Sequence, residues 1–206
     1  MGHLVLPNSG LKRDDEASKL GMWLFLYTEL LLFGGLFIVY TMYRFLYPDE
    51  FLQGSYHLSI PLGTINTIVL LTSSLTIAMG ITALQKGNKK LAVTLMLLTI
   101  VFAMVFMVNK YFEWSAKIEH GLFPGMDAFM QLPRGETLFF FLYFFMTGLH
   151  AIHIIVGGIL IGLVTREIIT GKQTSTNFAY TENAGLYWHL VDLIWIFLFP
   201  LFYLIH

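Results

Sequence analysis

Five long apolar segments, separated by short polar stretches, make up most of the chain. They lie at about 20–46, 60–84, 91–114, 137–165 and 184–205. Each is long enough to cross a bilayer as a helix, because a membrane-spanning helix needs about 20 mainly apolar residues. A membrane strand would need only about 10 residues and would alternate in polarity, which these segments do not. The pattern therefore predicts an all-α integral membrane protein, folded as a bundle of five transmembrane helices.

The stretches between these segments carry residues that end helices. Pro48 follows the first segment, residues 85–90 form a short basic turn, and residues 115–135 contain several glycines and prolines. Residues 1–19 are polar, and the apolar segment after them is too long for the core of a cleaved signal peptide. We therefore predict a polar N-terminal segment, 1–19, followed by a single transmembrane domain, 20–206.

The distribution of lysine and arginine predicts the orientation of the bundle. With five spans, the N-terminal segment and the loops at 85–90 and 166–183 share one side of the membrane. This side holds eight basic residues, namely Lys12, Arg13, Lys19, Lys86, Lys89, Lys90, Arg166 and Lys172. The other side holds four, namely Arg44, Lys110, Lys117 and Arg134. Because cytoplasmic loops carry the excess of positive charge, we expect a cytoplasmic N-terminus and a periplasmic C-terminus at His206.

The composition supports a membrane protein and excludes several functions. Hydrophobic residues make up 56% of the chain and charged residues 12%, whereas a soluble domain usually has about a quarter charged residues. The net charge of -1 gives no indication of nucleic-acid binding. The chain has no cysteine, which excludes disulfides, thiolate metal sites and iron–sulfur clusters within it.

Several polar side chains fall inside the predicted spans, where they are costly unless they are paired or hydrated. They are Glu29, Asn66, Glu113, His150, His153, His189 and Asp192. His150 and His153 are three residues apart, as are His189 and Asp192, so each pair shares one face of its helix. Glu29 lies about nine residues into the first span, or roughly 14 Å along a helix.

These side chains admit three interpretations. In the first, they hydrogen-bond between helices and fix the packing of the bundle. In the second, the three histidines ligate a metal or a haem, with Asp192 orienting His189. In the third, they relay protons. Under the first interpretation we expect His150 or His153 to pair with His189 or Asp192, because the fourth and fifth spans are antiparallel neighbours joined by a short loop.

Three stretches resemble subunit III of cytochrome c oxidase, in the short, five-helix bacterial form of that family. They are GMWLFLYTELLLFGGLF (21–37), GLHAIHIIVGG (148–158) and ENAGLYWHLVDLIWIFLFPLFYL (182–204). The most specific part is the run formed by Tyr187, Trp188, His189, Val191, Asp192 and Trp195. Compared with the long, seven-helix form, this chain lacks the first two helices, and Ala151 stands where glycine is more common.

The resemblance implies a non-redox subunit of an oxygen-reducing, proton-pumping oxidase in the bacterial inner membrane. Haem and copper would lie in the partner subunits I and II, so this chain would hold no metal and no catalytic residue. Its helices would form a cleft that holds phospholipids beside subunit I and supports proton uptake and the durability of the active site. Glu29 would be the family's buried acid, Arg166 would meet a lipid phosphate or anchor the helix, and Tyr187, Trp188 and Trp195 would pack the bundle.

The first span offers little support for a proton path through Glu29. After this acid come only apolar residues and glycines up to Val39, whereas a proton wire needs polar groups or waters every few ångströms. We therefore expect Glu29 to line a lipid-filled cleft.

The sequence is compatible with more than one kind of protein. Subunit III of a quinol oxidase and the companion subunit of a nitric-oxide reductase share the five-helix pattern. A histidine-ligated haem or metal protein is a further alternative. A small transporter is another, although the chain shows no internal repeat. Membership of a larger respiratory supercomplex also stays open.

Overall fold

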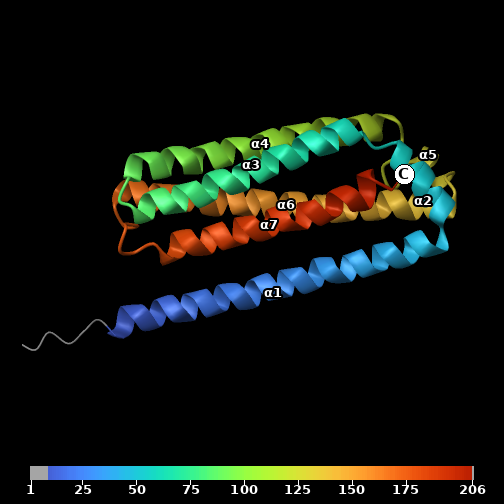
Figure 1. The fold of residues 1–206 in the computed structure, drawn as a ribbon. Helices are drawn as coiled ribbons and strands as arrows, with labels where there is room; N and C mark the ends of the chain where they lie inside the picture. Colours follow the sequence, from blue (N-terminus) through green and yellow to red (C-terminus); the bar gives the residue numbers. More distant parts are fainter. Residues whose placement is uncertain (1–8, 206) are drawn as a thin grey trace, which may run out of the picture.

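The computed structural model describes residues 9–205, and the side chains of residues 17–205 apart from 127 and 128. Figure 1 shows a helical bundle whose elements follow one another as α1 (Ser9–Leu46), α2 (Pro48–Tyr56), α3 (Ile60–Gln85), α4 (Lys89–Glu119), α5 (Asp127–Met130), α6 (Arg134–Thr170) and α7 (Ala179–Tyr203). Residues 1–8 of the predicted N-terminal segment, and His206 at the predicted periplasmic end, lie outside the described residues.

The five predicted spans are confirmed as five long helices. Among the described residues α1, α3, α4, α6 and α7 are each long and apolar enough to cross a membrane. Several of these helices extend beyond the predicted bounds. Hydropathy marks where the apolar part of a helix ends, whereas the helix itself continues through polar residues until a stop signal. The short helices α2 and α5 were not predicted, because both lie in polar stretches that were expected to be loops.

Local chemistry accounts for the ends of three long helices. Pro48 lies just past the end of α1 and is the first residue of α2. At this position the missing N–H of proline removes no helical hydrogen bond. The side chain of Asn88 caps α4 by accepting a hydrogen bond from the N–H of Leu91 at 3.2 Å. Gly171 ends α6 in the left-handed conformation, with φ at 81°, which glycine adopts without strain.

The long helices are arranged around α7. In Figure 1, α3 and α4 run side by side as a hairpin, α6 and α7 lie next to them, and α1 lies apart along the far side of α7. Helix α7 packs against α3, α6 and α1, whereas α1 is the least buried of the five spans. The bundle is therefore a four-helix body with α1 attached along one side.

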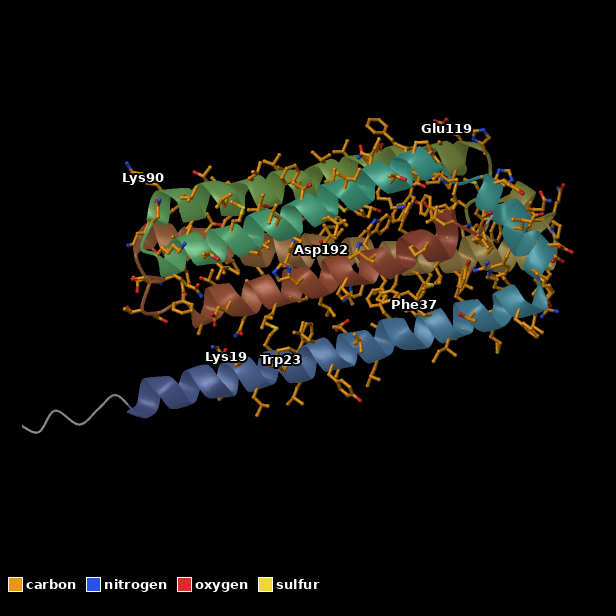
Figure 2. The ribbon with its side chains drawn as sticks, in the orientation of Figure 1. Lys19, Trp23, Phe37, Lys90, Glu119 and Asp192 are labelled. Atoms are coloured by element: carbon orange, nitrogen blue, oxygen red, sulfur yellow. The ribbon has the colours of Figure 1, made fainter. Side chains whose placement is uncertain are left out.

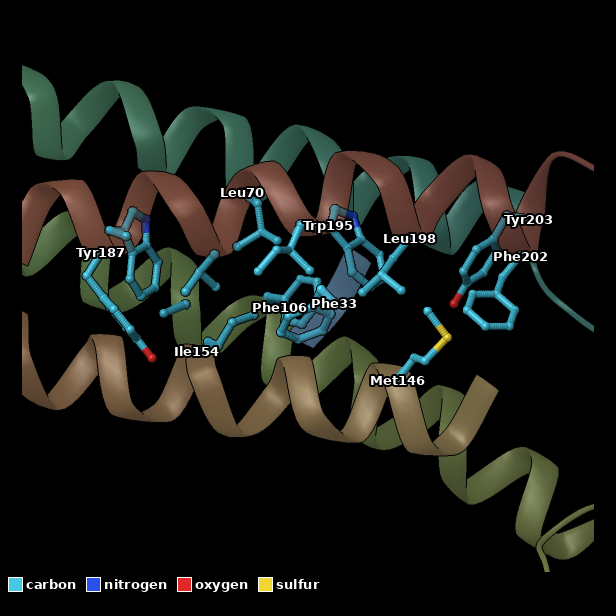
Figure 3. Packing of buried hydrophobic residues seen from close by; sticks show 14 of the residues in the cluster. Phe33, Leu70, Phe106, Met146, Ile154, Tyr187, Trp195, Leu198, Phe202 and Tyr203 are labelled. Carbon is cyan, nitrogen blue, oxygen red and sulfur yellow. The ribbon is translucent and has the colours of Figure 1, made fainter. Parts of the chain in front are cut away.

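Large aromatic side chains fill the core along α7. Trp188, Trp195 and Phe202 are fully buried and seven residues apart, so they lie along one face of the helix. Figure 3 shows this face packed against Ile154 and Met146 of α6. On α1, only a narrow stripe is buried, formed by Leu26, Phe33 and Tyr40 at the same spacing.

Candidate functional site

The acid predicted to be functional, Glu29, is paired with a histidine of α6. Its Oε2 lies 2.9 Å from Nε2 of His153, and the two side chains are only 16% and 12% exposed. Phe33 of α1 contacts the same imidazole edge-on, and Tyr187 of α7 stacks on it. This contact joins α1 to the rest of the bundle in the middle of the apolar region.

The second nitrogen of His153 restricts how the pair holds its proton. Nδ1 lies 2.7 Å from the carbonyl oxygen of Leu149, which can only accept a hydrogen bond. Nδ1 therefore carries a hydrogen. The hydrogen bond between Nε2 and Glu29 then contains a single further proton, held either by the imidazole as an ion pair or by the carboxyl group as a neutral pair. In either form the pair is neutral as a whole, which suits its apolar surroundings.

The motif on α7 docks against hydroxyl groups of α3. Nε1 of Trp188 donates to Ser73 Oγ and Nε1 of Trp195 donates to Thr67 Oγ1, both at 3.0 Å. Nδ1 of His189 lies 2.6 Å from Ser74 Oγ. These contacts explain the combination of tryptophans and histidine in the motif, because a buried indole N–H needs an acceptor.

The predicted pairing of His150 or His153 with His189 or Asp192 is wrong. His153 pairs with Glu29 of α1, and His189 contacts Ser74 of α3. His150 is fully buried between the rings of Trp195 and Phe106, and neither of its nitrogens has a hydrogen-bond partner among the described residues.

Asp192 is another buried polar side chain of α7. The side chain is 4% exposed, and neither carboxyl oxygen reaches a hydrogen-bond partner among the described residues. Ser74 is close enough to interact with this carboxyl group, and its hydroxyl also contacts Nδ1 of His189. A hydroxyl can accept a hydrogen bond from an imidazole N–H while it donates one to a carboxylate, so Ser74 can link His189 to Asp192.

Asn66 connects α3 to α4, which agrees with the predicted role in interhelical contacts. Its Oδ1 accepts a hydrogen bond from Nδ2 of Asn109 at 2.9 Å. The same two helices are also joined by a contact of 2.8 Å between the hydroxyl groups of Thr76 and Thr99. Asn109 was not predicted as the partner of Asn66, because their separation in the sequence does not indicate how close they lie in the folded protein.

Glu113 lies in a charged cluster that the sequence analysis missed. Nζ of Lys110 donates to Glu113 at 2.9 Å and Nζ of Lys117 does so at 3.3 Å, while the hydroxyl of Tyr203 donates at 2.6 Å. Both lysines and the glutamate are less than a tenth exposed. The sequence analysis counted the two lysines only among the basic residues on one side of the membrane. Their spacing of three and four residues from Glu113 nevertheless places all three side chains on one helix face.

Arg166 lies near the end of α6, at the end of the bundle where α1 begins. Its side chain is exposed and forms no ion pair with the described part of the chain. It is therefore available to a group outside this protein.

Two cavities lie along the junction between α1 and α7, and together they are called the α1–α7 groove. At one end, a cavity of about 460 Å³ is lined by Lys19 and Trp23 of α1, Gln85 of α3, and Glu182 and His189 of α7. Further along the same helices, a slot of about 220 Å³ is almost entirely apolar, and its walls are Leu30, Phe33, Gly34, Phe37, Leu193, Ile194 and Phe197. Figure 2 labels Lys19, Trp23 and Phe37 in this order along α1, with α7 beside them. The groove is thus polar at one end and apolar in the middle of the bundle.

The histidines do not gather into a metal site within the described part of the chain, where no group of three or more His, Cys, Asp or Glu side chains is placed to hold an ion. Instead, each histidine has a different partner: His150 packs against Trp195, His153 bonds to Glu29 and His189 contacts Ser74.

Comparison with known proteins identifies the family. The family model for cytochrome c oxidase subunit III matches residues 12–206. This chain belongs to the cytochrome c oxidase subunit III family. The match confirms the resemblance found in the sequence.

Relatives of this subunit III family member include different kinds of oxidase. The cytochrome c oxidase subunit 3 of Corynebacterium diphtheriae is 29% identical, over 96% of this chain and 92% of the relative. The probable quinol oxidase subunit 3 of Staphylococcus haemolyticus is 28% identical, over 100% of this chain and 97% of the relative. The relatives are subunits of haem-copper oxidases, which reduce oxygen.

A third relative has a longer chain. The haem-copper oxidase subunit I+III of Aeropyrum pernix is 30% identical over 89% of this chain, and this chain spans 22% of its length. By its name, that protein carries subunit I and subunit III in one polypeptide.

Proposed function

We propose that this chain is the non-redox subunit III of a bacterial terminal oxidase that takes electrons from cytochrome c. In this role it lies in the inner membrane, with its N-terminus in the cytoplasm, beside subunits I and II, which carry haem and copper. Membership of the subunit III family supports the assignment. The fused relative supports a position next to subunit I, since its name places both subunits in one chain.

The groove between α1 and α7 is the observation that carries the more detailed proposal, which is that it holds a phospholipid. Lys19 lies at its polar end, where its ammonium group is 3.0 Å from the carboxylate of Glu182 and would also attract a phosphate. The apolar slot between Phe33 and Phe197 suits an acyl chain. Trp23 lines the polar end, and tryptophan favours the boundary between head groups and hydrocarbon. One amphipathic lipid would therefore match both parts of the groove.

Glu29 and His153 line neither cavity of the groove, but their contact would hold α1 in position beside it. Their contact fixes α1 to α6, while most of α1 remains exposed. The proposed consequence is support for proton uptake and for the durability of the oxidase during turnover, without a direct proton path through Glu29. Arg166, at the same end of the bundle as Lys19, would bind a second phosphate.

Filling the slot tests the lipid proposal. Gly34 lines the slot and a Cβ added there meets nothing within 4 Å, so the side chain of Gly34→Phe should enter the slot and block the acyl chain. Native mass spectrometry of the purified oxidase complex should then find one phospholipid fewer than in the wild type. Gly21→Phe is the matched control, because Gly21 is also free of close neighbours but lies outside the slot. Equal lipid content in both variants would contradict the proposal.

Replacing the acid tests the role of Glu29. In the assembled complex, Glu29→Gln should leave the initial rate of oxygen reduction nearly unchanged and shorten the time over which activity lasts during turnover. Glu119→Gln, an exposed glutamate on α4, provides the control. Immediate loss of turnover in assembled Glu29→Gln oxidase would place this carboxyl group on the reaction path.

A quinol oxidase is the second candidate, favoured by the relative that matches this chain over its whole length. Oxygen consumption by the purified complex with reduced cytochrome c and with a quinol distinguishes the two. Activity with quinol alone would assign this chain to the second class.

A further inference from the structure

The charged cluster at the end of α4 contains more positive than negative charge. Lys110 and Lys117 share one carboxylate, that of Glu113, and all three side chains are less than a tenth exposed. Glu119, the next acid along α4, is exposed and does not line the cluster. A buried charge without a counter-charge is costly, so this site is suited to one additional anion.

The two lysines differ in how well they are satisfied. Lys110 uses three donors, to Glu113 at 2.9 Å, to Tyr203 at 2.7 Å and to Tyr143 at 3.3 Å. Lys117 makes a single hydrogen bond within the described part of the chain, at 3.3 Å to Glu113. Since an ammonium group has three N–H donors, Lys117 retains two for another ligand.

A cavity opens next to Lys117. It has a volume of about 240 Å³, several times the roughly 30 Å³ that one water occupies in the liquid, and is lined by His57, Ser59, Leu62, Phe112, Glu113, Ala116, Lys117, His120 and Leu122. His57 and His120 are exposed, while Lys117 is buried. The cavity is therefore reached past two imidazoles and contains a partly unsatisfied ammonium group.

The start of α3 adds to the preference for an anion. Ser59, which lines the cavity, is the N-cap residue of α3, and its side chain makes no capping hydrogen bond. The first N–H groups of this 26-residue helix therefore do not donate to the Ser59 side chain, and the helix dipole favours negative charge at this end. Glu113 is the acid lining the cavity, and it already accepts bonds from Lys110, Lys117 and Tyr203.

We infer that this cavity binds a phosphate group, as free phosphate or as the head group of an anionic phospholipid. Lys117 supplies the charge-assisted hydrogen bonds, and the start of α3 and the two histidines surround the remaining oxygens. The site lies at the end of the bundle with α2 and α5, opposite the end where α1 begins (Figure 1), so it is separate from the polar end of the α1–α7 groove. The inference does not depend on the proposed role of that groove.

Binding to the purified full-length chain in detergent tests the site, with two probes. Calorimetric titration with inorganic phosphate measures the free anion, and native mass spectrometry after reconstitution with phosphatidylglycerol measures the lipid. Lys117→Gln should weaken the binding by about tenfold or more, because charge-assisted hydrogen bonds are stronger than those between neutral groups. Lys117→Arg should retain it. Lys90→Gln is the control, since Lys90 is an exposed lysine at the other end of α4.

A second variant supplies the anion from within the chain. His57→Glu places a carboxylate at the exposed mouth of the cavity and should compete with phosphate, even if Lys117→Gln does not fold. Binding of phosphatidylglycerol alone identifies a lipid head group, and binding of both probes identifies a general phosphate site. If neither probe binds, the inference is wrong. It is also wrong if His57→Glu, together with Lys117→Gln where that variant folds, binds the probes as well as the Lys90→Gln control.

Discussion

Single side chains in this protein join helices through short polar contacts surrounded by aromatic rings. Trp188 and Trp195 each bring a bulky apolar ring and one N–H donor, and α3 places a hydroxyl acceptor opposite each N–H. Polar contacts between membrane helices contribute little energy individually, on average about 0.6 kcal/mol, but they have strict geometry. The contacts of α7 with α3 therefore fix the register of the two helices more than they stabilise them.

Removing one acceptor should show this small but specific effect. We expect Ser73→Ala to lower the free energy of unfolding by about 1 kcal/mol, because the buried indole N–H of Trp188 loses its acceptor. Thr72→Ala on the same helix should have a smaller effect, since Thr72 is only partly buried and bonds to its own helix. Denaturant titration of the two variants in the same detergent measures the difference. Equal unfolding free energies would show that the Trp188 contact does not stabilise the fold.

The charged cluster should respond much more strongly to substitution. Glu113→Gln would leave Lys110 and Lys117 buried with no carboxylate, which typically costs about 3–5 kcal/mol. The double variant Glu113→Gln/Lys110→Met should recover part of this loss, because it also removes one unpaired charge. Glu119→Gln, at an exposed position, should stay within about 0.5 kcal/mol of the wild type. Thermal unfolding of all three variants tests this order.

At the scale of the helices, close packing depends on small residues at particular positions. A Cβ at Gly157 of α6 would lie 2.8 Å from the ring of Trp188, whereas one at the neighbouring Gly158 would meet nothing within 4 Å. Gly157 therefore lets α7 bring its indole against the backbone of α6. Gly158 is not required by packing within this chain.

Alanine substitutions at these two neighbours should thus have opposite results. Gly157→Ala should destabilise the bundle by about 1–3 kcal/mol, since the ring or the backbone must shift to admit the methyl group. Gly158→Ala should be neutral or slightly stabilising, because alanine favours the helix more than glycine does. Comparing their unfolding midpoints tests the packing directly, and a similar loss in both variants would contradict it.

In the molecule as a whole, the helices form a tightly packed group of four with α1 attached along α7. Leu26, Phe33 and Tyr40 form the narrow buried face of α1, and the Tyr40 hydroxyl donates to the carbonyl of Leu201 near the end of α7. Leu201 lies in the last turn of α7, where carbonyls generally lack a donor within the helix, so the contact helps to satisfy the helix end. The loose attachment of α1 is what leaves room for the groove.

The whole chain should be colourless when purified alone. The contacts of His150, His153 and His189 are directed to different helices and rings, and the sequence has no cysteine to ligate a metal. We expect no Soret band in the absorption spectrum and no stoichiometric iron or copper by elemental analysis. A Soret band, or one metal ion per chain, would support the haem or metal alternative and would place a redox centre in this subunit.

The sequence alone determined the number of membrane helices and the family. Both depend on information that is local in the chain, since hydropathy over about 20 residues decides whether a segment can cross a bilayer. The motif containing Trp188 and Trp195 was equally visible, and the family match confirmed what it indicated. The sequence also identified Glu29, His153 and Glu113 as polar groups that need a partner.

Only the tertiary structure decided which partner each group has. His153 was expected to bind α7, yet it binds Glu29, 124 residues away, because α1 packs against both α6 and α7. Lys110 and Lys117 were counted only among the charges on one side of the membrane, but both are buried around Glu113, and Tyr203 at the end of α7 bonds to Lys110 and to Glu113. Residue spacing fixes the face of a helix on which a side chain lies, whereas its neighbour depends on how the helices pack, and that is set by the summed contacts of the whole bundle.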